Sequence, residues 1–350
     1  MLRKTRILGC LAAVTLIAAG CTSSPDSEAE AAGTQAADDA ACSGAVLQIA
    51  QANPGYPRLP VYVALHGGFF ADQGLDVRVA ETDAGADAAA ALIGGSADVS
   101  PGTYSDVLLA QSRGAGIVAF AATGYEEISN LVMKTSVMQE KGITADSTPE
   151  EKVQALEGLR IGVTSPGSST DLLVRGIMIQ QGLDPDRDAS ITPVGASAMA
   201  SAFSRGQLDA FALSSPSANA AAAAGDGEVL LDFSAGDYPG ISGPLSMTLN
   251  TSPATAESKA QELRCFSAGL TSALELMKSD PERAKEIAWE EFDGVVDREA
   301  YDATIDVAVD AFAENTSIDA GDAEARKDFI AQVEAPVGDL DVADTYVDLG

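Results

Sequence analysis

The chain has 350 residues, 46% of them hydrophobic and 21% charged, so it is long enough for about two domains with a large core. Its 21 Lys and Arg residues stand against 52 Asp and Glu residues, a formal net charge of −31. This balance argues against a nucleic-acid-binding surface, because a phosphate backbone needs positive counter-charges. The single histidine, His66, argues against a hydrolase triad and against a zinc site with several histidines.

The N-terminus predicts a lipoprotein signal peptide over residues 1–20. A basic start is followed by an apolar run, residues 7–19, that is too short to span a bilayer. The small residues directly before Cys21 resemble a bacterial lipobox, and this resemblance implies a thioether-linked diacylglycerol on Cys21 after cleavage. An ordinary secretory signal with a chance cysteine is the alternative. We therefore expect an extracytoplasmic protein whose lipid anchors it to the cell membrane.

Residues 21–41 predict a flexible tether, because they are small, polar or acidic and cannot offset their ordering entropy by burial. The folded body then begins near Cys42. With Cys10 in the leader and Cys21 lipidated, Cys42 and Cys265 remain in a compartment that permits disulfides. We predict a bridge between them, which would close a long loop; two free buried thiols are the alternative.

The same order of elements occurs twice, in residues 61–114 and in residues 171–225. Each copy runs from a helix ending in Gly-Leu-Asp through a strand, an alanine-rich helix closed by glycine, a short segment with an aspartate, a Ser/Pro turn and another helix. Glycine after a helix suits a left-handed cap, and short apolar runs between helices suit parallel strands. The pattern predicts an α/β protein of two lobes, each a mostly parallel sheet flanked by helices.

The expected strands of the first lobe are residues 45–50, 77–80, 99, 117–121 and 131–134. Those of the second lobe are residues 159–163, 191–194, 208–212 and 229–231, and residues 245–249 return the chain to the first.

The predicted first lobe is discontinuous and consists of residues 42–130 and 247–350. Residues 131–246 form the predicted second lobe. From Pro253 onward the pattern is nearly all helical until an acidic, poorly patterned tail that begins at Pro336. We place a hinge where the chain crosses between the lobes, near residues 129–133 and 245–250.

Three hydroxyl-rich loops follow predicted strands and open helices. Ligands of open parallel sheets bind beyond the carboxyl ends of strands, where helix N-termini present N–H groups. Each loop alone is explained by helix capping, for which Ser and Thr are ordinary residues, but three equivalent loops favour a site. Tyr56 follows the first strand and is expected over the ligand. The candidate ligand-binding residues are Tyr56, Thr103, Tyr104, Ser105, Ser168, Ser169, Thr170, Ser214 and Ser215.

Other polar residues near these loops give weaker signals. Arg58 and Arg175 do not form a convincing clamp for an anion. Asp98 and Asp209, which recur in the two copies, are expected to orient turns. The sequence contains no P-loop and no metal-ligand spacing, so we expect no ATPase activity, no metal and no cofactor in this chain.

A set of short motifs, taken in order, resembles a known family over about residues 45–292. The motifs are Gly68-Phe69-Phe70 before Gly74-Leu75-Asp76-Val77, then Gly95-Ser96-Ala97-Asp98-Val99, residues 156–163, Gly167-Ser168-Ser169-Thr170 and Gly206-Gln207-Leu208-Asp209-Ala210. They resemble solute-binding proteins of ABC importers for nitrate, sulfonates, taurine, bicarbonate and thiamine-pyrimidine precursors. The resemblance implies a two-lobed periplasmic-binding-protein-like fold of type II, with a ligand cleft between the lobes. Ser215-Pro216 departs from the family, in which an acidic residue often precedes this proline.

The resemblance implies the solute-binding component of an ABC importer, which captures a sulfonate, a carboxylate or a pyrimidine-like heterocycle by lobe closure. Its expected partners are the solute, a permease and an ATPase on separate chains, and the membrane through the lipid. We expect a monomer without enzymatic activity. Two alternatives stay open: an enzyme of cofactor-precursor biosynthesis on the same fold, and a surface lipoprotein that contacts only proteins.

Overall fold

The computed structural model describes residues 42–349, apart from residues 53–54, 83–84, 126–128, 216, 234, 239–244 and 295. The predicted signal peptide, the tether and the lipidation site Cys21 lie outside the described residues. No helix in the described part of the chain is long and apolar enough to cross a membrane.

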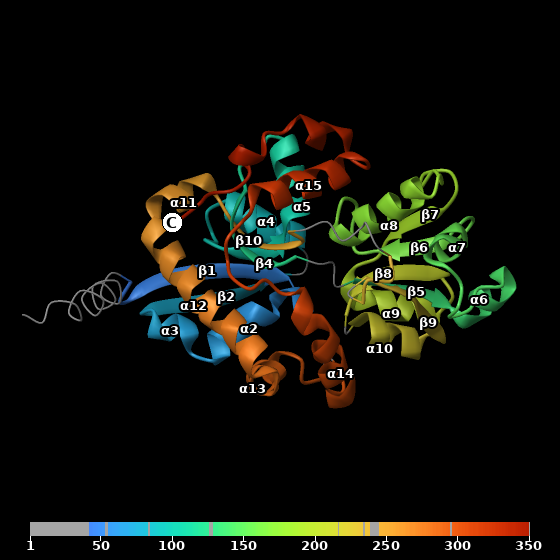
Figure 1. Cartoon of the computed structure of the whole chain (residues 1–350), viewed down its shortest axis with the longest axis horizontal. Coiled ribbons are helices and arrows are strands. Elements are labelled where there is room, and N and C mark those ends of the chain that lie inside the picture. The colour runs from blue at the N-terminus through green and yellow to red at the C-terminus, as the bar shows by residue number, and fades with distance from the viewer. Residues whose placement is uncertain are drawn as a thin grey trace, which may run out of the picture. The chain divides into compact units, whose positions relative to one another are not determined.

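Two small sheets form what we call region I (Figure 1). Strand β1 (Ala45–Ala52) is parallel to β2 (Leu75–Thr82). In the other sheet, β10 (Met247–Thr251) lies between β3 (Ser100–Thr103) and β4 (Val118–Gly124) and is antiparallel to both. Residues 100–102, expected to form a turn, are therefore a strand, because β10 supplies partners for their backbone groups.

A five-stranded sheet forms region II, in the order β7-β6-β8-β5-β9 (Figure 1). Its strands are β5 (Ser129–Lys134), β6 (Arg160–Val163), β7 (Ser190–Pro193), β8 (Ala210–Ser214) and β9 (Gly227–Asp232). Strand β6 is parallel to β7 and β8, whereas β5 is antiparallel to β8 and β9.

The pairing of β5 and β10 corrects two predictions. Residues 131–134, counted among the strands of the first lobe, pair with β8 and β9 of region II. The sheets are mixed rather than mostly parallel, because β5 and β10 each run antiparallel to their neighbours. Both are the strands by which the chain crosses from one region to the other.

Helices cover the sheets of both regions (Figure 1). Region I carries η1 (Tyr56–Arg58), α2 (Leu59–His66), α3 (Phe69–Asp72), α4 (Gly85–Ile93), α5 (Tyr104–Ser112), α11 (Pro253–Ser258), α12 (Ala260–Ser279), α13 (Pro281–Ala288), η2 (Trp289–Glu291), α14 (Arg298–Ala308), η3 (Val309–Ala311), α15 (Ala320–Ala331), η4 (Ala335–Asp339) and η5 (Val342–Asp344). Region II carries α6 (Thr135–Lys141), α7 (Pro149–Gln154), α8 (Ser169–Gln180), α9 (Ala196–Ser204) and α10 (Ser217–Ala224).

Local signals in the sequence explain where several of these helices begin and end. Asp280 caps α13 and accepts the N–H of Arg283 at 3.2 Å, with Pro281 at the first helical position. The predicted left-handed glycines Gly95 and Gly206 have φ values of 71°, which only glycine adopts without strain.

Aromatic side chains fill the core of each region. Phe70 stacks on Phe266 in region I, with ring centroids 4.3 Å apart, and Phe203 meets Phe211 edge-on at 4.8 Å in region II. A further cluster of buried residues joins the regions, because α15 packs on both α5 and α8. There a Cβ added to Gly176 of α8 would lie 2.9 Å from the ring of Phe329.

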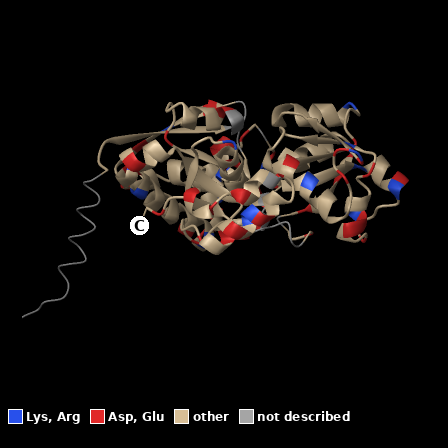
Figure 2. Cartoon of the chain, turned by 90° about the horizontal axis from the view of Figure 1, so that it is seen from above, with Lys and Arg blue, Asp and Glu red and all other residues tan. Residues whose placement is uncertain are grey.

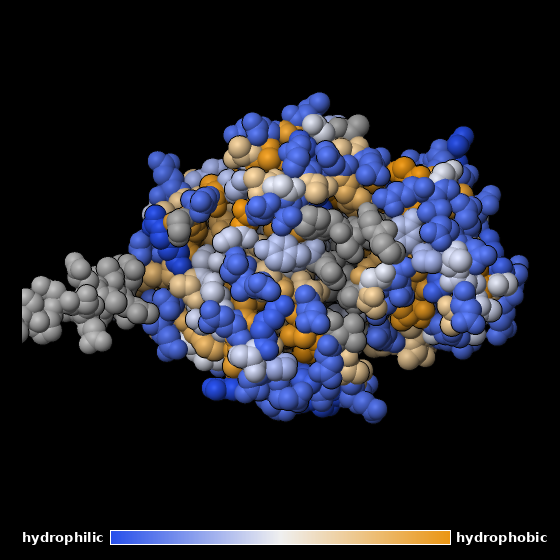
Figure 3. Space-filling view, in the orientation of Figure 1, coloured by the Kyte–Doolittle hydropathy of each residue, from blue (hydrophilic) through white to orange (hydrophobic). Residues whose placement is uncertain are grey.

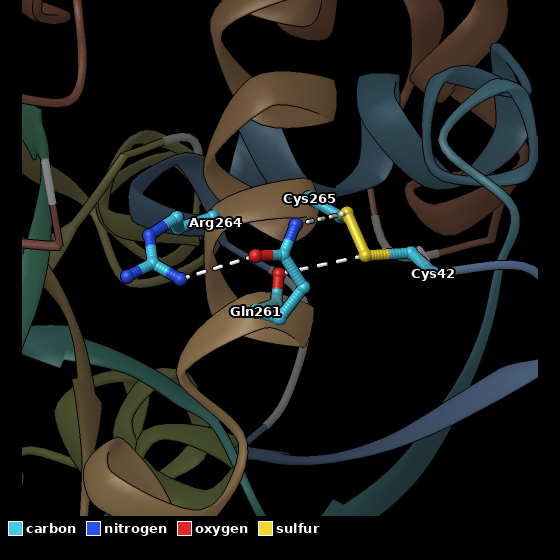
Figure 4. Close-up of a disulfide and its surroundings, with 4 residues drawn as sticks. All are labelled: Cys42, Gln261, Arg264 and Cys265. Atoms are coloured by element: carbon cyan, nitrogen blue, oxygen red, sulfur yellow. Dashed lines mark hydrogen bonds between the residues drawn. A yellow bond between two sulfur atoms is a disulfide. The ribbon is translucent and has the colours of Figure 1, made fainter. Parts of the chain in front are cut away.

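The predicted disulfide between Cys42 and Cys265 is present (Figure 4). Its two residues are 223 positions apart in the sequence, and both side chains are buried. The bond ties the residues just before β1 to α12. Gln261, one turn earlier on α12, places its amide nitrogen 3.9 Å from the Cys265 sulfur (Figure 4).

The C-terminal tail is packed, although its sequence pattern is poor. The N–H of Ala119 in β4 donates to the carbonyl of Thr345 at 2.9 Å, and the N–H of Val347 donates back to Ala119 at 2.8 Å. The tail therefore extends the sheet of β4 by a short parallel bridge at Tyr346. Periodicity could not reveal this pairing, because the two segments are far apart in the sequence.

The surface reflects the acidic composition. Asp and Glu residues are spread over both regions (Figure 2), and hydrophilic residues dominate the face seen in Figure 3. Of the described large hydrophobic residues, only Ile93 and Val229 are exposed. Such isolated residues require no partner.

Candidate functional site

The predicted loop at Thr103 opens α5 in region I. The Thr103 hydroxyl accepts the N–H of Asp106 at 3.3 Å, while the Asp106 carboxylate accepts the backbone N–H and the hydroxyl of Thr103 at 2.8 and 2.9 Å. The N–H of Tyr104 donates to the carbonyl of Ser246 at 3.1 Å. The loop is thus a complete capping box.

The two predicted tyrosines lie inside the protein. The Tyr56 side chain is fully buried, and its hydroxyl donates to the carbonyl of Tyr301 at 2.9 Å. The Tyr104 side chain is also fully buried and shares a hydrogen bond with Thr345; burial raises the pKa of Tyr104 to about 12. Tyr56 was expected on a loop over the ligand, whereas the structure places it in η1 within the aromatic core beside Phe292.

Charged and polar groups gather at the start of α5. Burial lowers the pKa of the Arg58 guanidinium, opposed by the nearby Tyr62, Asp106 and Glu81. Burial raises the pKa of Asp106, opposed by its bonds from Thr103 and by Arg58 and Arg326. Gln51, at the end of β1, donates to Tyr62 at 3.4 Å and to Glu81 at 3.0 Å. We call this set the Arg58 cluster: Gln51, Arg58, Tyr62, Glu81, Asp106 and Arg326.

Sequence reasoning missed most of the Arg58 cluster. From the sequence, Arg58 and Arg175 do not form a convincing anion clamp. The other members of the cluster come from β1, α2, β2, α5 and α15. Apart from Tyr62, only the fold brings them close to Arg58. The position of Gln51 at the carboxyl end of the first strand is the one signal that pointed to it.

Buried polar atoms without a hydrogen-bond partner among the described residues include two uncharged ones in this part of region I. They are the hydroxyl of Ser105 and the amide oxygen of Gln51. Each of the two residues is 1% exposed. A buried polar group without a partner costs free energy, and such groups are rare enough in proteins to need an explanation.

In region II, the predicted loop at Ser168 opens α8 after β6. The Ser168 hydroxyl donates to the carbonyl of Ser165 at 2.7 Å and accepts the N–H of Asp171 at 3.3 Å. The buried Thr170 hydroxyl lies 3.0 Å from the hydroxyls of both Thr164 and Ser168. These hydroxyls therefore bind one another and the loop backbone.

Arg175, the second weak candidate for an anion clamp, is already engaged. Its guanidinium binds Asp171 and Asp186 at 2.8 Å each. The carboxylate of Asp171 also accepts the N–H of Gly167 at 2.7 Å. Arg175 therefore stabilises the start of α8 instead of presenting a free charge.

Ser214 and Ser215 lie at the end of β8, and Ser215 is buried. The side-chain amide of Asn130 lies 3.1 Å from both the Ser215 hydroxyl and the Asp232 carboxylate. The same amide lies 2.8 Å from the side chain of Asn219 in α10. The residue that follows, Pro216, lies outside the described residues.

The fold places the Ser168 and Ser214 loops together at one edge of region II. Strands β6 and β8 are adjacent and parallel, so the loops that follow them lie at the same end of the sheet. The Thr103 loop belongs to region I. Its helix reaches region II with its other end, where the Arg113 guanidinium lies 3.6 Å from the position that a Cβ on Gly167 would take. Ser169 is partly exposed on the first turn of α8.

One group of described side chains could hold a metal ion. His66, at the end of α2, lies 2.9 Å from Glu290 and 2.7 Å from Glu291. The Glu290 carboxylate lies at Nδ1 of the imidazole ring and the Glu291 carboxylate at Nε2. Two ion pairs with the histidine explain this arrangement. The expectation of a protein without a metal stays a prediction.

Comparisons with known proteins agree on the fold. The sequence model of the NMT1-like family matches residues 52–289. A structure from Bordetella bronchiseptica RB50 is 25% identical, with a TM-score of 0.72 over 87% of this chain and 95% of that one. The alkanesulfonate-binding protein SsuA from Xanthomonas axonopodis pv. citri, bound to MOPS, is 18% identical, with a TM-score of 0.70 over 87% and 99%.

The periplasmic nitrate-binding protein NrtA from Synechocystis PCC 6803 is 14% identical, with a TM-score of 0.63 over 86% of each chain. These similarities show the α/β periplasmic-binding-protein fold. No curated protein matches the sequence.

Proposed function

The chain belongs to the NMT1-like family, and from this membership we propose that it is the solute-binding component of an ABC importer. The observation that carries the proposal is the pair of hydroxyl-bearing loops at one edge of region II together with the Arg58 cluster in region I. Proteins of the same fold bind alkanesulfonate and nitrate, which supports the capture of a small polar solute here.

The proposed mechanism is closure of two lobes, residues 42–130 with 247–350 and residues 131–246, about crossings near 129–133 and 245–250. A solute that contacts both lobes selects the closed form, because it binds that form better than the open one. A lipid on Cys21 would hold the protein near its permease and raise its effective concentration there. The permease and the ATPase are proposed as separate chains.

The structure changes which residues we propose as solute contacts. Thr103 and Ser105 in region I and Ser168, Ser169, Thr170, Ser214 and Ser215 in region II stay proposed contacts. Tyr56 and Tyr104 have hydroxyls bound inside the protein and are proposed to support the site through packing.

A thermal-shift screen of the full-length chain in mild detergent tests the proposal. The panel holds sulfonates, nitrate, bicarbonate, pyrimidines, flavins and aromatic carboxylates, after partial unfolding has removed any retained solute. A solute at 100 times its Kd adds about 2.7 kcal/mol of stability. The expected result is at least one hit that is lost when Ser168→Ala and Thr170→Ala are combined.

Ser272→Ala is the matched control, because the printed hydrogen bond of the Ser272 hydroxyl is to a carbonyl of its own helix, at 3.3 Å. This variant should keep the hit unchanged. Conversion of the hit to a product, followed by NMR, would favour the enzyme alternative instead. The absence of a thermal shift with every compound of the panel would contradict the proposal.

A further inference from the structure

A histidine and two glutamates form a cluster that contains none of the proposed solute contacts. His66 ends α2, whereas Glu290 and Glu291 belong to η2, and Glu291 lies 225 positions after His66 in the sequence. The Glu290 carboxylate is 2.9 Å from Nδ1 of the ring, and the Glu291 carboxylate is 2.7 Å from Nε2. We call these three residues the His66 cluster.

The core of region I holds the two segments of the cluster next to each other. Tyr62 lies one turn before His66 on α2, and its buried ring meets Phe292 edge-on, with ring centroids 5.9 Å apart. Phe292 directly follows Glu291 and is also fully buried. The end of α2 and η2 are therefore placed together by packing that does not depend on the charges of the cluster.

The His66 cluster has more negative than positive charge. Among the described residues, Glu290 and Glu291 form ion pairs with His66 alone. Two carboxylates carry two negative charges, whereas one imidazole carries a single positive charge at most. The C-terminal end of a helix is itself negative because of the macrodipole. A further positive charge is therefore favoured at this end of α2.

The neutral imidazole ring cannot satisfy both carboxylates. It has one N–H and one lone pair, so it donates to one carboxylate and turns its lone pair toward the other. A metal ion at the lone pair removes this mismatch, because an imidazole nitrogen and carboxylate oxygens can bind the same ion. The doubly protonated ring, which donates to both carboxylates, is the arrangement of the cluster without a metal.

The distances allow one ion to contact all three residues. The candidate ligand atoms lie within 4.8 Å of one another, and the ligands of a tetrahedral Zn²⁺ are about 3.3 Å apart. Glu291 already lies at Nε2, so Glu290 makes most of the adjustment. Its side chain is 71% exposed, whereas those of His66 and Glu291 are 23% and 24% exposed. Glu290 can therefore turn toward the ion without disturbing the core.

We propose that the His66 cluster binds one divalent transition-metal ion of the zinc class, through Nε2 of His66 and the carboxylates of Glu290 and Glu291. An imidazole ligand favours such an ion over Mg²⁺ and Ca²⁺, which prefer oxygen ligands alone. The ion ties the end of α2 to η2 and so stabilises region I. The site does not depend on the proposed solute-binding function, and it revises the expectation that the chain holds no metal.

Zinc binding to the untagged full-length chain in mild detergent tests the site, after EDTA has removed any metal and has itself been removed. With ¹⁵N-labelled histidine, NMR reports on His66 alone, because it is the single histidine of the chain. We expect ZnCl₂ to shift the ¹⁵N resonance of Nε2 and to raise the Tm, whereas MgCl₂ at the same concentration leaves the resonance unchanged. A His66 resonance that ZnCl₂ does not shift would overturn the proposal.

Two variants test the ligands. His66→Gln and Glu290→Gln should each weaken zinc binding at least tenfold by calorimetry, and the Tm without zinc shows whether each variant is folded. Because Glu290 is exposed, Glu290→Gln should stay folded even where His66→Gln does not. Zinc affinity equal to that of the wild type in folded Glu290→Gln would overturn the proposal, since other carboxylates would then hold the ion.

Glu150→Gln is the matched control. It removes an exposed carboxylate from the first turn of α7 in region II, so it should leave the affinity for zinc unchanged. A loss of affinity as large as that of Glu290→Gln would show that zinc responds to the overall negative charge of the chain, and would overturn the assignment of the site.

Discussion

The two copies of the repeat use one aspartate in the same way and then diverge. Asp98 in region I accepts the N–H of Gln48 at 2.9 Å, and Asp209 in region II accepts the N–H of Arg160 at 2.9 Å. After Asp209 the chain enters β8, inside the sheet of region II. After Asp98 it enters β3, whose partner is the returning strand β10. The local turn is therefore shared, whereas the strand partner depends on distant segments.

Among the described residues, region I contains a disulfide bond and region II contains none. The Cys42–Cys265 bond joins the residues just before β1 to the longest described helix of region I, α12. The N-terminal and C-terminal segments of region I are far apart in the sequence. Bringing them together on folding therefore costs more loop-closure entropy than bringing together the segments of region II, which follow one another directly. This difference predicts where stability is most easily lost.

The largest expected effect comes from removing the disulfide. Cys42→Ser combined with Cys265→Ser should lower the free energy of unfolding by about 2–5 kcal/mol, because the unfolded chain regains the freedom of a long loop. Urea denaturation with and without a reducing agent measures the effect. Hydrogen exchange should quicken in β1 and α12 before it quickens in β6 and β8; equal changes in both regions would contradict the comparison.

An alanine substitution at one buried glycine of each region compares how well the two cores tolerate an added methyl group. A Cβ on Gly269 of α12 would meet the backbone oxygen of Phe69 at 2.9 Å, whereas one on Gly162 of β6 would meet the side-chain tips of Leu208 and Met199 at 2.6 and 2.8 Å. Side-chain tips move more easily than backbone. Gly269→Ala should therefore cost about 2–3 kcal/mol and Gly162→Ala about 1 kcal/mol, measured by urea denaturation. A larger loss of stability for Gly162→Ala than for Gly269→Ala would show that region I adjusts to an added methyl group more easily than region II.

Tyr56→Phe isolates one hydrogen bond in the aromatic core of region I. The variant leaves the carbonyl of Tyr301 without its donor and should lose about 1 kcal/mol of stability. The Kd for the solute should not change, because the Tyr56 hydroxyl points into the core. A tenfold weaker Kd with unchanged stability would return Tyr56 to the binding site.

The smallest effect is at Asp209. Its bond from Arg160 holds the pKa of the Asp209 carboxyl below its ordinary value. A depressed folded pKa means that the stabilisation is present above about pH 4 and is lost as the pH falls through the folded pKa. Because Arg160 is half exposed, Asp209→Asn should cost only about 0.5–1 kcal/mol at pH 7. The difference between the variant and the wild type should shrink toward pH 3.

Local signals in the sequence predict where some helices begin and end. Helix α4 begins and ends where its alanines and glycines indicate, and Asp280-Pro281 begins α13. The disulfide followed from elimination among four cysteines. These features depend on neighbours within a few residues or on the chemistry of the compartment.

What could not be predicted depends on contacts between distant segments. Arg326 reaches the Arg58 cluster from α15, and the tail pairs with β4 only because the fold brings them together. The hydroxyls of the Ser168 loop illustrate the same limit: the sequence shows donors and acceptors, but only the structure shows that they satisfy one another.

We propose that one solute is held by both regions. Hydrogen–deuterium exchange of the full-length chain, with and without the solute found in the thermal-shift screen, tests this directly. We expect slower exchange on binding at the start of α5 in region I and, to a similar degree, at the starts of α8 and α10 in region II. Slowing in only one region, or in neither, would contradict it.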